Sequence, residues 1–323
     1  MRFVFVMDPM QKVLPDKDTS FALQRAALKR GHELLHTELR DLFAKDGDVW
    51  TRARELRVQD GAPFFEYGAV GDVRFADTDA VFIRKDPPFD SEYLYATLLL
   101  ERARGQTLIV NDPRGLRDAN EKLYALHFSR HMPKTLVASH RERILDFADE
   151  VGGTAVIKPL HGAGGAGVLL LSRKDQNARS IIETLTREET VAAMVQEYLP
   201  AVRQGDKRVL LLDGQVLGGI NRVPRSDDLR SNIHVGGRVE PCEVTAQERA
   251  VVDDIAPRLR ADGLYFVGLD FIGGKLTEVN VTSPTGIQEL SAHQGRDVSE
   301  DVIAWVEKNV TSGAARSKEP PRS

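Results

Sequence analysis

A glycine-rich segment, residues 156–171, has the residue types that could bind phosphate groups. Lys158 lies in an apolar run that reads as a strand, and Val168–Leu171 reads as the strand that follows. Because glycine has no Cβ, backbone N–H groups of such a loop can approach phosphate oxygens, while the Lys158 ammonium could lie against the α- or β-phosphate. We expect a nucleotide-binding flap here, with a flexible surface hairpin as the alternative. Its glycines are Gly162, Gly164, Gly165 and Gly167.

The same glycines must be tested against the dinucleotide-binding fingerprint, since Gly162, Gly164 and Gly167 formally fit G-x-G-x-x-G. That fingerprint needs a strand, the loop and then a helix. Here a second strand follows the loop instead. The chain also lacks the G-x-x-x-x-G-K-[ST] pattern of P-loop proteins. A dinucleotide-dependent oxidoreductase and a P-loop enzyme are therefore excluded.

A second segment, residues 267–281, could hold a metal ion. Side chains alternate across a strand, so Glu278 and Asn280 share a face. A three-residue connection or a bulge would pair Asp270 with Glu278, whereas a two-residue Gly-Gly turn alone would place Asp270 on the opposite face. Two carboxylates and an amide oxygen are hard ligands suited to Mg²⁺ held jointly with phosphates. The alternative is an exposed polar strand face.

Basic residues gather in the region between these two segments. Arg208, Arg222 and Arg230, with Lys207 and Arg225, could converge on the oxygens of a transferring phosphoryl group, or they could be solvated surface charges. The connection 222–239 is long, polar and glycine-bearing, which is typical of a loop that closes over a ligand.

Other candidate groups carry weaker signals. The segment Glu197-Tyr198-Leu199-Pro200 could be a hinge whose backbone contacts a nucleotide base, or an ordinary interdomain strand, which the pattern alone favours. Cys242 follows a proline in a polar loop and has no catalytic context. His127 and His131 stand at i and i+4 without a neighbouring carboxylate motif, so surface or capping roles are expected.

The elements that position these residues differ between the two halves of the chain. In the first ~120 residues strands alternate with helices, which predicts an α/β domain with a parallel sheet covered on both faces. After a helix that starts near Asn120, strands come in pairs joined by short glycine turns, which predicts antiparallel hairpins and an α+β arrangement. The expected pairs are 155–158 with 168–171, 208–213 with 215–221, and 265–271 with 276–282.

Composition sets the broad class of protein. Apolar residues make up 41% and charged residues 28%, which is ordinary for a globular chain of about two domains. The formal net charge of −4 argues against nucleic-acid or anionic-membrane partners. One cysteine cannot form an internal disulfide, and no apolar run approaches the ~20 residues that cross a bilayer. We expect a cytoplasmic protein whose segment 312–323 is disordered.

Several longer strings add a resemblance to a known family. The chain resembles bacterial glutathione synthetases of the ATP-grasp superfamily from residue 3 to about residue 305. The most diagnostic strings are Ile83-Arg-Lys-Asp-Pro-Pro-Phe-Asp90 and Asn280-Val-Thr-Ser-Pro-Thr285. The others are Val6–Pro9, Asn120–Leu123, the loop 158–165, Asp206–Val209, and Leu269-Asp270 with Thr277–Val279.

The resemblance implies an N-terminal parallel-sheet (pre-ATP-grasp) domain followed by a two-lobed ATP-grasp fold with antiparallel sheets. The implied boundaries are 1–121 for the N-terminal substrate-binding domain, 122–199 for the small lobe with the flap, 200–311 for the C-terminal lobe, and 312–323 for the tail. It also implies the joining of γ-glutamylcysteine and glycine to glutathione, with ATP converted to ADP and phosphate through an acyl phosphate. A homo-oligomer, a tetramer by resemblance, is expected.

Roles for individual residues follow from the resemblance. ATP would contact Lys122, Lys158, the flap glycines, Glu197, Tyr198 and Leu199. Mg²⁺ or Mn²⁺ would be held by Asp270, Glu278 and Asn280. The transferring phosphoryl and acyl groups would be surrounded by Arg208, Arg222, Arg230 and Asn232. Substrate recognition would involve Arg84, Asp86, Ser283 and Thr285.

The chain also departs from the family pattern. His161 and Ala163 stand where an acidic residue and methionine are expected, and residues 286–289 look divergent beside the acceptor site. Two other functions therefore stay open. One is an ATP-grasp ligase that adds a different amino acid to a peptide or protein tail, and the other is a non-catalytic nucleotide-binding homologue.

Overall fold

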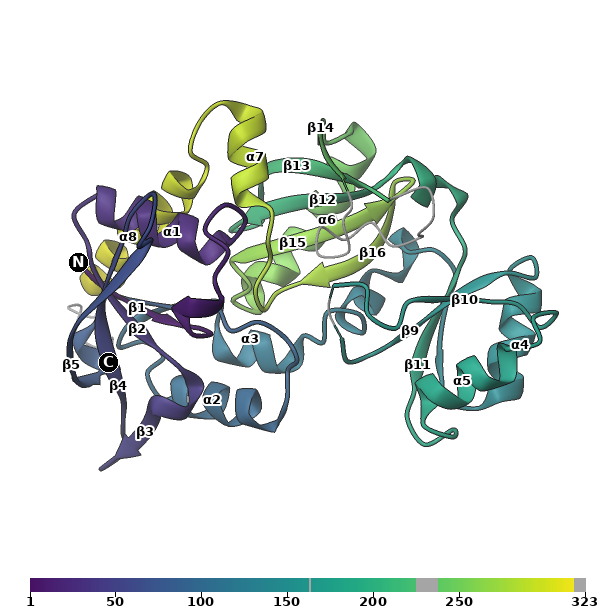
Figure 1. Ribbon diagram of the computed structural model, residues 1–323, viewed down its shortest axis with the longest axis horizontal. Helices are drawn as coiled ribbons and strands as arrows, with labels where there is room; N and C mark the ends of the chain where they lie inside the picture. Colours follow the sequence, from purple (N-terminus) through teal and green to yellow (C-terminus); the bar gives the residue numbers. More distant parts are fainter. Residues whose placement is uncertain (163, 225–237, 317–323) are drawn as a thin grey trace, which may run out of the picture.

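The computed structural model describes residues 1–162, 164–224 and 238–316, with side chains as far as residue 310. Its described strands form sheets of seven, four and five strands. The seven-stranded sheet lies within residues 2–110, here called the N-terminal domain, and the four-stranded sheet lies within residues 135–197, here called the small lobe. The five-stranded sheet, within residues 206–280, is here called the C-terminal lobe and lies in the middle (Figure 1). The predicted mixture of an α/β domain with two antiparallel lobes is confirmed.

The centre of the N-terminal sheet is parallel, in the order β2-β1-β6-β7. Residues Phe3–Val6 are completely buried, as expected for a parallel strand covered on both faces. Helix α1 begins after Asp18, whose carboxylate accepts the backbone N–H of Phe21 at 2.7 Å and so satisfies a free donor of the first turn. These elements are β1 (Arg2–Val6), α1 (Thr19–Lys29), β2 (Glu33–Thr37), β6 (Ala80–Ile83), α2 (Ser91–Glu101), β7 (Leu108–Val110) and α3 (Pro113–Asp118), with 3-10 helices at Met10–Lys12, Leu39–Asp41 and Phe75–Asp77.

Three antiparallel strands that were not predicted extend this parallel centre: β3 (Leu42–Lys45), β4 (Asp48–Val58) and β5 (Phe65–Arg74). β4 pairs antiparallel with β2 and alternates buried with exposed residues along much of its length. Its exposed positions are mostly arginine and glutamate. The segment therefore lacks the continuous apolar run by which the buried strands are recognised.

The small lobe contains the predicted hairpin, with β9 antiparallel to β10. Its helices cover one face of the sheet, because Ala155 and Ile157 of β9 belong to the same buried cluster as residues of α4 and α5. The alternate residues Val156 and Lys158 are left for the other face. A turn and a 3-10 helix (Tyr124–His131) replace the helix predicted near Asn120. The lobe comprises β8 (Thr135–Ala138), α4 (Arg141–Glu150), β9 (Ala155–Pro159), β10 (Leu169–Leu171), α5 (Ala178–Thr186) and β11 (Ala193–Glu197).

The C-terminal lobe has an antiparallel sheet in the order β14-β13-β12-β15-β16, and both predicted hairpins are confirmed. Its elements are a 3-10 helix (Pro200–Gln204), β12 (Asp206–Leu212), β13 (Gln215–Val223), β14 (Arg238–Cys242), α6 (Ala246–Ala261), β15 (Phe266–Ile272), β16 (Lys275–Asn280), α7 (Ile287–Gln294) and α8 (Ser299–Arg316). Among the described residues, no helix combines the length and apolar character that a membrane span requires.

The last helix, α8, returns to the N-terminal domain (Figure 1). Val302, Ile303 and Val306 join the buried cluster that includes α1 and β1. The Glu307 carboxylate accepts two hydrogen bonds from the Arg30 guanidinium, at 2.9 and 2.5 Å, and its Oε1 lies 2.7 Å from His32 Nε2. α8 continues to Arg316, past residue 312 where the predicted tail begins, and residues 317–323 lie outside the described chain.

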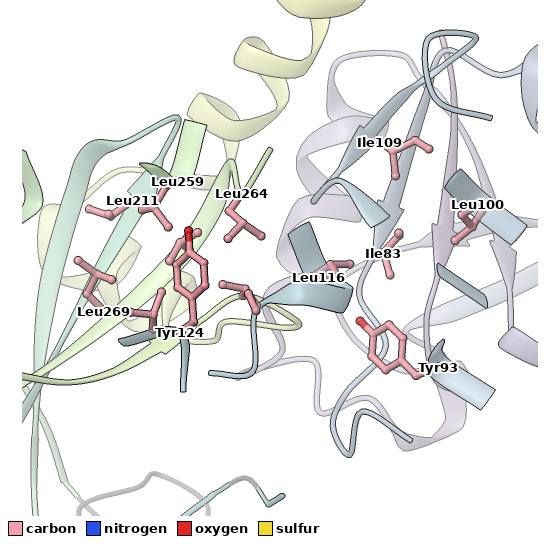
Figure 2. Close-up of a cluster of buried hydrophobic side chains, with 14 of the residues drawn as sticks. Ile83, Tyr93, Leu100, Ile109, Leu116, Tyr124, Leu211, Leu259, Leu264 and Leu269 are labelled. Atoms are coloured by element: carbon pink, nitrogen blue, oxygen red, sulfur yellow. The ribbon is translucent and has the colours of Figure 1, made fainter. Parts of the chain in front are cut away.

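One buried apolar cluster joins the N-terminal domain to the C-terminal lobe. Figure 2 shows Ile83 and Leu100 on one side, Leu211 and Leu259 on the other, and Leu116 of α3 between them. α3 reaches the C-terminal lobe closely because its residue 115 is glycine. A Cβ at Gly115 would lie 2.2 Å from the carbonyl oxygen of Asp262.

Replacing Gly115 with alanine should therefore destabilise the contact between the two parts. Overpacking a tight backbone contact costs about 3 kcal/mol, because α3 must move away from Asp262 and open the apolar cluster. Calorimetry should show a melting temperature lower by several degrees. Gly71→Ala is the matched control, since a Cβ there would meet nothing within 4 Å. Equal melting of the two variants would contradict the tight contact.

Candidate active site

A cavity of about 570 Å³ opens where the three parts of the chain meet. It is lined by most of the residues predicted from the sequence: Asp86, Lys122, Lys158, Gly162, Gly164, Gly165, Glu197, Tyr198, Leu199, Arg208, Arg222, Asp270, Glu278, Asn280, Ser283 and Thr285. Gly167 and Arg84 do not line it. Arg230 and Asn232 lie outside the described residues, as does most of the predicted closing loop 222–239.

The hairpin of β15 and β16 brings the predicted metal ligands together. Gly273 and Gly274 form a two-residue turn with φ values of 55° and 74°, and Ile272 pairs with Lys275. The register then shifts by one residue, so that Thr277 has no direct partner and Asp270 pairs with Glu278. Of the two routes left open by the sequence, the protein uses the bulge.

Two arginines and an amide surround the carboxylate of Asp270. Arg208 donates to both its oxygens at 2.8 Å, Arg222 approaches Oδ2 at 3.0 Å, and the Asn280 amide donates to Oδ2 at 3.1 Å. Burial acts against charge on this carboxyl, but the guanidinium groups of Arg208 and Arg222 hold the pKa of Asp270 well below its usual range. Asp270 is therefore an anion in the fold.

Two lysines surround the other carboxylate, Glu278. The ammonium nitrogens of Lys122 and Lys158 lie 3.5 and 3.6 Å from its Oε1. Burial raises the pKa of this carboxyl, but the two ammonium groups outweigh it and bring the pKa of Glu278 below its ordinary value. Burial lowers the pKa of Lys158, with a further contribution from Lys122. Lys122 comes from the segment before the small lobe and Lys158 from the flap strand, so the flap and the C-terminal sheet meet at Glu278.

The sequence did not single out Asp206, which lines the same cavity. Its Oδ2 lies 2.8 Å from the Arg222 guanidinium, which thereby bridges Asp206 and Asp270. Asp206 of β12 lies opposite Arg222 of β13 only because the register of the two strands shifts between Leu210 and Leu211. A strict Asp213-Gly214 turn would place Asn221 opposite Asp206, so no turn rule could have found this pair.

The arrangement fits a divalent cation held with phosphates. Within the described part of the chain, no three His, Cys, Asp or Glu side chains gather as a metal site. The predicted set is of another kind, with two carboxylates and the Asn280 amide. Carboxylates on paired strands and an amide are hard oxygen donors. Among the described residues, Lys122, Lys158, Arg208 and Arg222 are ion-paired with Asp206, Asp270 and Glu278, so basic groups that could bind a polyanionic ligand are gathered at this place.

The end of the cavity beside the small lobe is largely apolar. The hinge residues Glu197, Tyr198 and Leu199 line it, where β11 ends and the 3-10 helix after Leu199 begins. Further lining residues there are Pro133, Val156, Val168, Leu169, Leu170 and Val202. An apolar wall beside the backbone of residues 197–199 is a chemical surrounding suited to a purine base. Glu197, Tyr198 and Leu199 thus line the cavity, and their contact with a nucleotide base stays a prediction.

The flap glycines have the backbone conformations that a side chain would resist. Gly164 and Gly165 have φ values of 65° and 80°, and the Lys122 ammonium donates to the carbonyl of Gly162 at 3.2 Å. Gly167 closes the loop away from the cavity, where a Cβ would lie 3.0 Å from Pro159. The close packing against Pro159 therefore requires glycine at position 167.

At the opposite end, Asp86, Ser283 and Thr285 line the cavity, and Thr285 accepts a hydrogen bond from Arg208 at 3.2 Å. Arg84 is 4% exposed and lies behind this wall. Its guanidinium donates to Ser20 Oγ and to the carbonyl of Pro284, both at 3.0 Å. In this structure Arg84 therefore fixes the 283–285 turn instead of facing the cavity.

Comparisons with known proteins agree with this geometry. Residues 1–117 match the family model for the N-terminal domain of prokaryotic glutathione synthetase, and residues 121–295 match that for its ATP-grasp domain. The chain is 44% identical over 317 residues to a glutathione synthetase from Thermosynechococcus vestitus, covering 95% of this chain and 99% of that one. It is 43% identical over 290 residues to that of Salmonella typhimurium, covering 89% and 92%.

Solved structures of similar shape are more distant in sequence. The D-cycloserine synthetase DcsG superimposes with a TM-score of 0.67 at 16% identity, covering 95% of this chain and 99% of that chain. The ATP-grasp ligase PsnB, in complex with its precursor peptide and AMPPNP, gives 0.62 at 18% identity, covering 96% and 98%. At such identities the likeness shows the fold alone.

Proposed function

We propose a function from one premise: this chain belongs to the family of prokaryotic glutathione synthetases. It is an ATP-dependent ligase that joins γ-glutamylcysteine to glycine and forms glutathione, ADP and phosphate. The observation that supports this most directly is similarity to glutathione synthetases along nearly the whole chain. The flap hairpin of β9 and β10 and the hairpin of β15 and β16 are both present. The two lobes that carry the charged residues face one cavity.

The nucleotide would lie between the flap and the C-terminal sheet. Its base would lie against the apolar wall beside residues 197–199, and its phosphates would lie under the flap glycines. The ammonium groups of Lys122 and Lys158 both lie near the Glu278 carboxylate. Bound phosphate oxygens would share these two positive charges with Glu278.

Asp270, Glu278 and Asn280 would hold a divalent cation, Mg²⁺ or Mn²⁺. The ion supplies charge neutralisation at the phosphates when it is bound. The protein's contribution is the paired-strand geometry, with Asp270 opposite Glu278 and Asn280 two residues further along β16.

The arginines would act on the reacting groups. A carboxylate oxygen of the dipeptide attacks the γ-phosphorus, the bond to ADP breaks, and an acyl phosphate forms. The amine of glycine then attacks the acyl carbon, loses a proton and displaces phosphate. Arg208 and Arg222 stabilise the negative charge on the equatorial and acyl oxygens, and the flap excludes water that would hydrolyse the acyl phosphate.

The dipeptide would lie against Asp86, Ser283 and Thr285, in the turn that Arg84 fixes from behind. Arg230 and Asn232 remain proposed contacts of the transferring groups. We also propose a cytoplasmic homo-oligomer, a tetramer by resemblance, without nucleic-acid or membrane partners; sedimentation velocity tests the assembly.

The reaction is tested by ADP release with both amino substrates and with each omitted. We expect ADP release to require γ-glutamylcysteine, and glutathione to form only when glycine is added. ADP release that is indifferent to the dipeptide would remove this assignment. Product formation with another amino acid or a peptide tail in place of these substrates would favour the other ligase, and nucleotide binding without turnover would favour the non-catalytic homologue.

A further inference from the structure

The β-bulge in β16 places a threonine at the junction of the candidate metal ligands. Thr277 is the residue that the register skips, between Leu276, opposite Phe271, and Glu278, opposite Asp270. It is 7% exposed and lines the cavity. A bulge leaves its extra residue without a regular ladder partner, so the bulge needs other contacts to hold it in place.

Both polar ends of Thr277 have such contacts. Its hydroxyl donates to the backbone carbonyl of Asp270 at 3.1 Å, and its carbonyl accepts from the Lys158 ammonium at 3.4 Å. The hydroxyl thus binds the bulge to the strand residue that bears one carboxylate, while the next residue, Glu278, bears the other. The position also touches the flap lysine.

The alternative register shows what the bulge achieves. With the same Gly273-Gly274 turn and no bulge, Thr277 would lie opposite Asp270, and Glu278 opposite Leu269. Successive side chains alternate across a strand, so Glu278 would then be on the face opposite Asp270. The buried hydroxyl of Thr277 makes the side-chain hydrogen bond that joins the bulged residue to Asp270.

We infer that Thr277 is a positioning residue for the metal site: its hydroxyl holds the bulge that puts Asp270 and Glu278 on one face. The inference rests on the proposed function, since it takes these carboxylates as metal ligands. The γ-methyl group of Thr277 has no part in it, so serine should serve at this position and valine, which has the same shape, should not.

The test measures Mn²⁺ binding to the full-length protein with ADP present, from the paramagnetic resonance of free Mn²⁺. Supporting contacts of metal ligands typically contribute 10–100-fold to affinity, so Thr277→Val should weaken Mn²⁺ binding by at least ~10-fold and Thr277→Ser by less than ~3-fold. Thr277→Ala and Thr277→Ser differ from each other only by the hydroxyl group. If the valine variant does not fold, the difference in Mn²⁺ affinity between these two variants tests the role of the hydroxyl. The alanine variant should bind as weakly as the valine variant.

Thr97→Val is the matched control. Thr97 is fully buried in α2, does not line the cavity, and its hydroxyl also donates to a carbonyl, that of Leu94 at 2.7 Å. The Thr97→Val substitution should lower the melting temperature of the protein without changing its affinity for Mn²⁺. Affinities of the valine or alanine variant within ~3-fold of a wild type that binds Mn²⁺ would overturn the role of Thr277 and leave the ligase assignment standing. A wild type that binds no Mn²⁺ with ADP would overturn both the metal set and this inference.

Discussion

With lysine in place of Arg222, kcat for glutathione formation should fall by about 10²–10³, the typical loss when one donor to a transition-state oxyanion is removed. Arg222 is 3% exposed, and its guanidinium bridges Asp206 at 2.8 Å and Asp270 at 3.0 Å. Nη2 makes both of these contacts, so the planar guanidinium still has the N–H groups of Nη1 to present to the reacting groups, whereas an ammonium is a single point of charge that the two carboxylates would occupy. The KM for ATP should change much less than kcat.

Lysine is the informative replacement because it keeps the positive charge. A neutral side chain would leave Asp206 and Asp270 short of a partner, and breaking a buried ion pair in this way costs about 3–5 kcal/mol. Arg258→Lys is a suitable control, since Arg258 is an outward-facing partner of Asp262. Single-turnover ADP release and melting temperature should be measured for both variants. A lysine variant with more than about a tenth of the wild-type kcat would contradict a transition-state role for Arg222.

Much of this site could be predicted because turn chemistry and strand alternation act locally. Gly273-Gly274 identifies the hairpin, and the alternation of Glu278 with Asn280 follows from the pleat. The glycine flap was distinguished from a dinucleotide loop by the strand after it, and β10 confirms that. Grouping Lys158 with Glu278 across two lobes required the family resemblance, since no local rule relates residues so far apart in sequence.

The remaining features depend on contacts that local patterns do not encode. Strand β4 has a charged exposed face and β5 exposes mainly small residues, so neither has the apolar run of a buried strand. Only their pairing, β4 with β2 and both β3 and β5 with β4, identifies these strands as part of the sheet. The pairing of Asp206 with Arg222 needs an irregularity in the ladder. Arg84 is predicted to meet substrate from its place in a diagnostic string, and no local pattern indicated that it is buried and donates to the carbonyl of Pro284, 200 residues further along the chain.

Glu278→Gln should lower turnover by about 10³-fold, because it removes the charge of a proposed metal ligand, and metal catalysis supplies several kcal/mol at about 1.4 kcal/mol per tenfold in rate. It also leaves Lys122 and Lys158 near each other without their shared carboxylate. We expect the ligand-free variant to be less stable at neutral pH and to be stabilised more strongly than wild type by inorganic phosphate, since an anion can take the place of the lost charge.

The pH dependence separates this electrostatic effect from simple misfolding. The pKa of Glu278 is lower in the fold than its ordinary value, so its contribution to stability is present above the unfolded pKa of ~4.3 and is lost as pH falls through the folded pKa. The free energies of unfolding of wild type and Glu278→Gln should therefore differ at pH 7 and converge as the pH falls below ~4. Glu66→Gln, at an exposed position of β5, should match wild type throughout. A constant difference across this range, with normal turnover, would mean that Glu278 is neither the partner of the lysines nor a ligand of the metal.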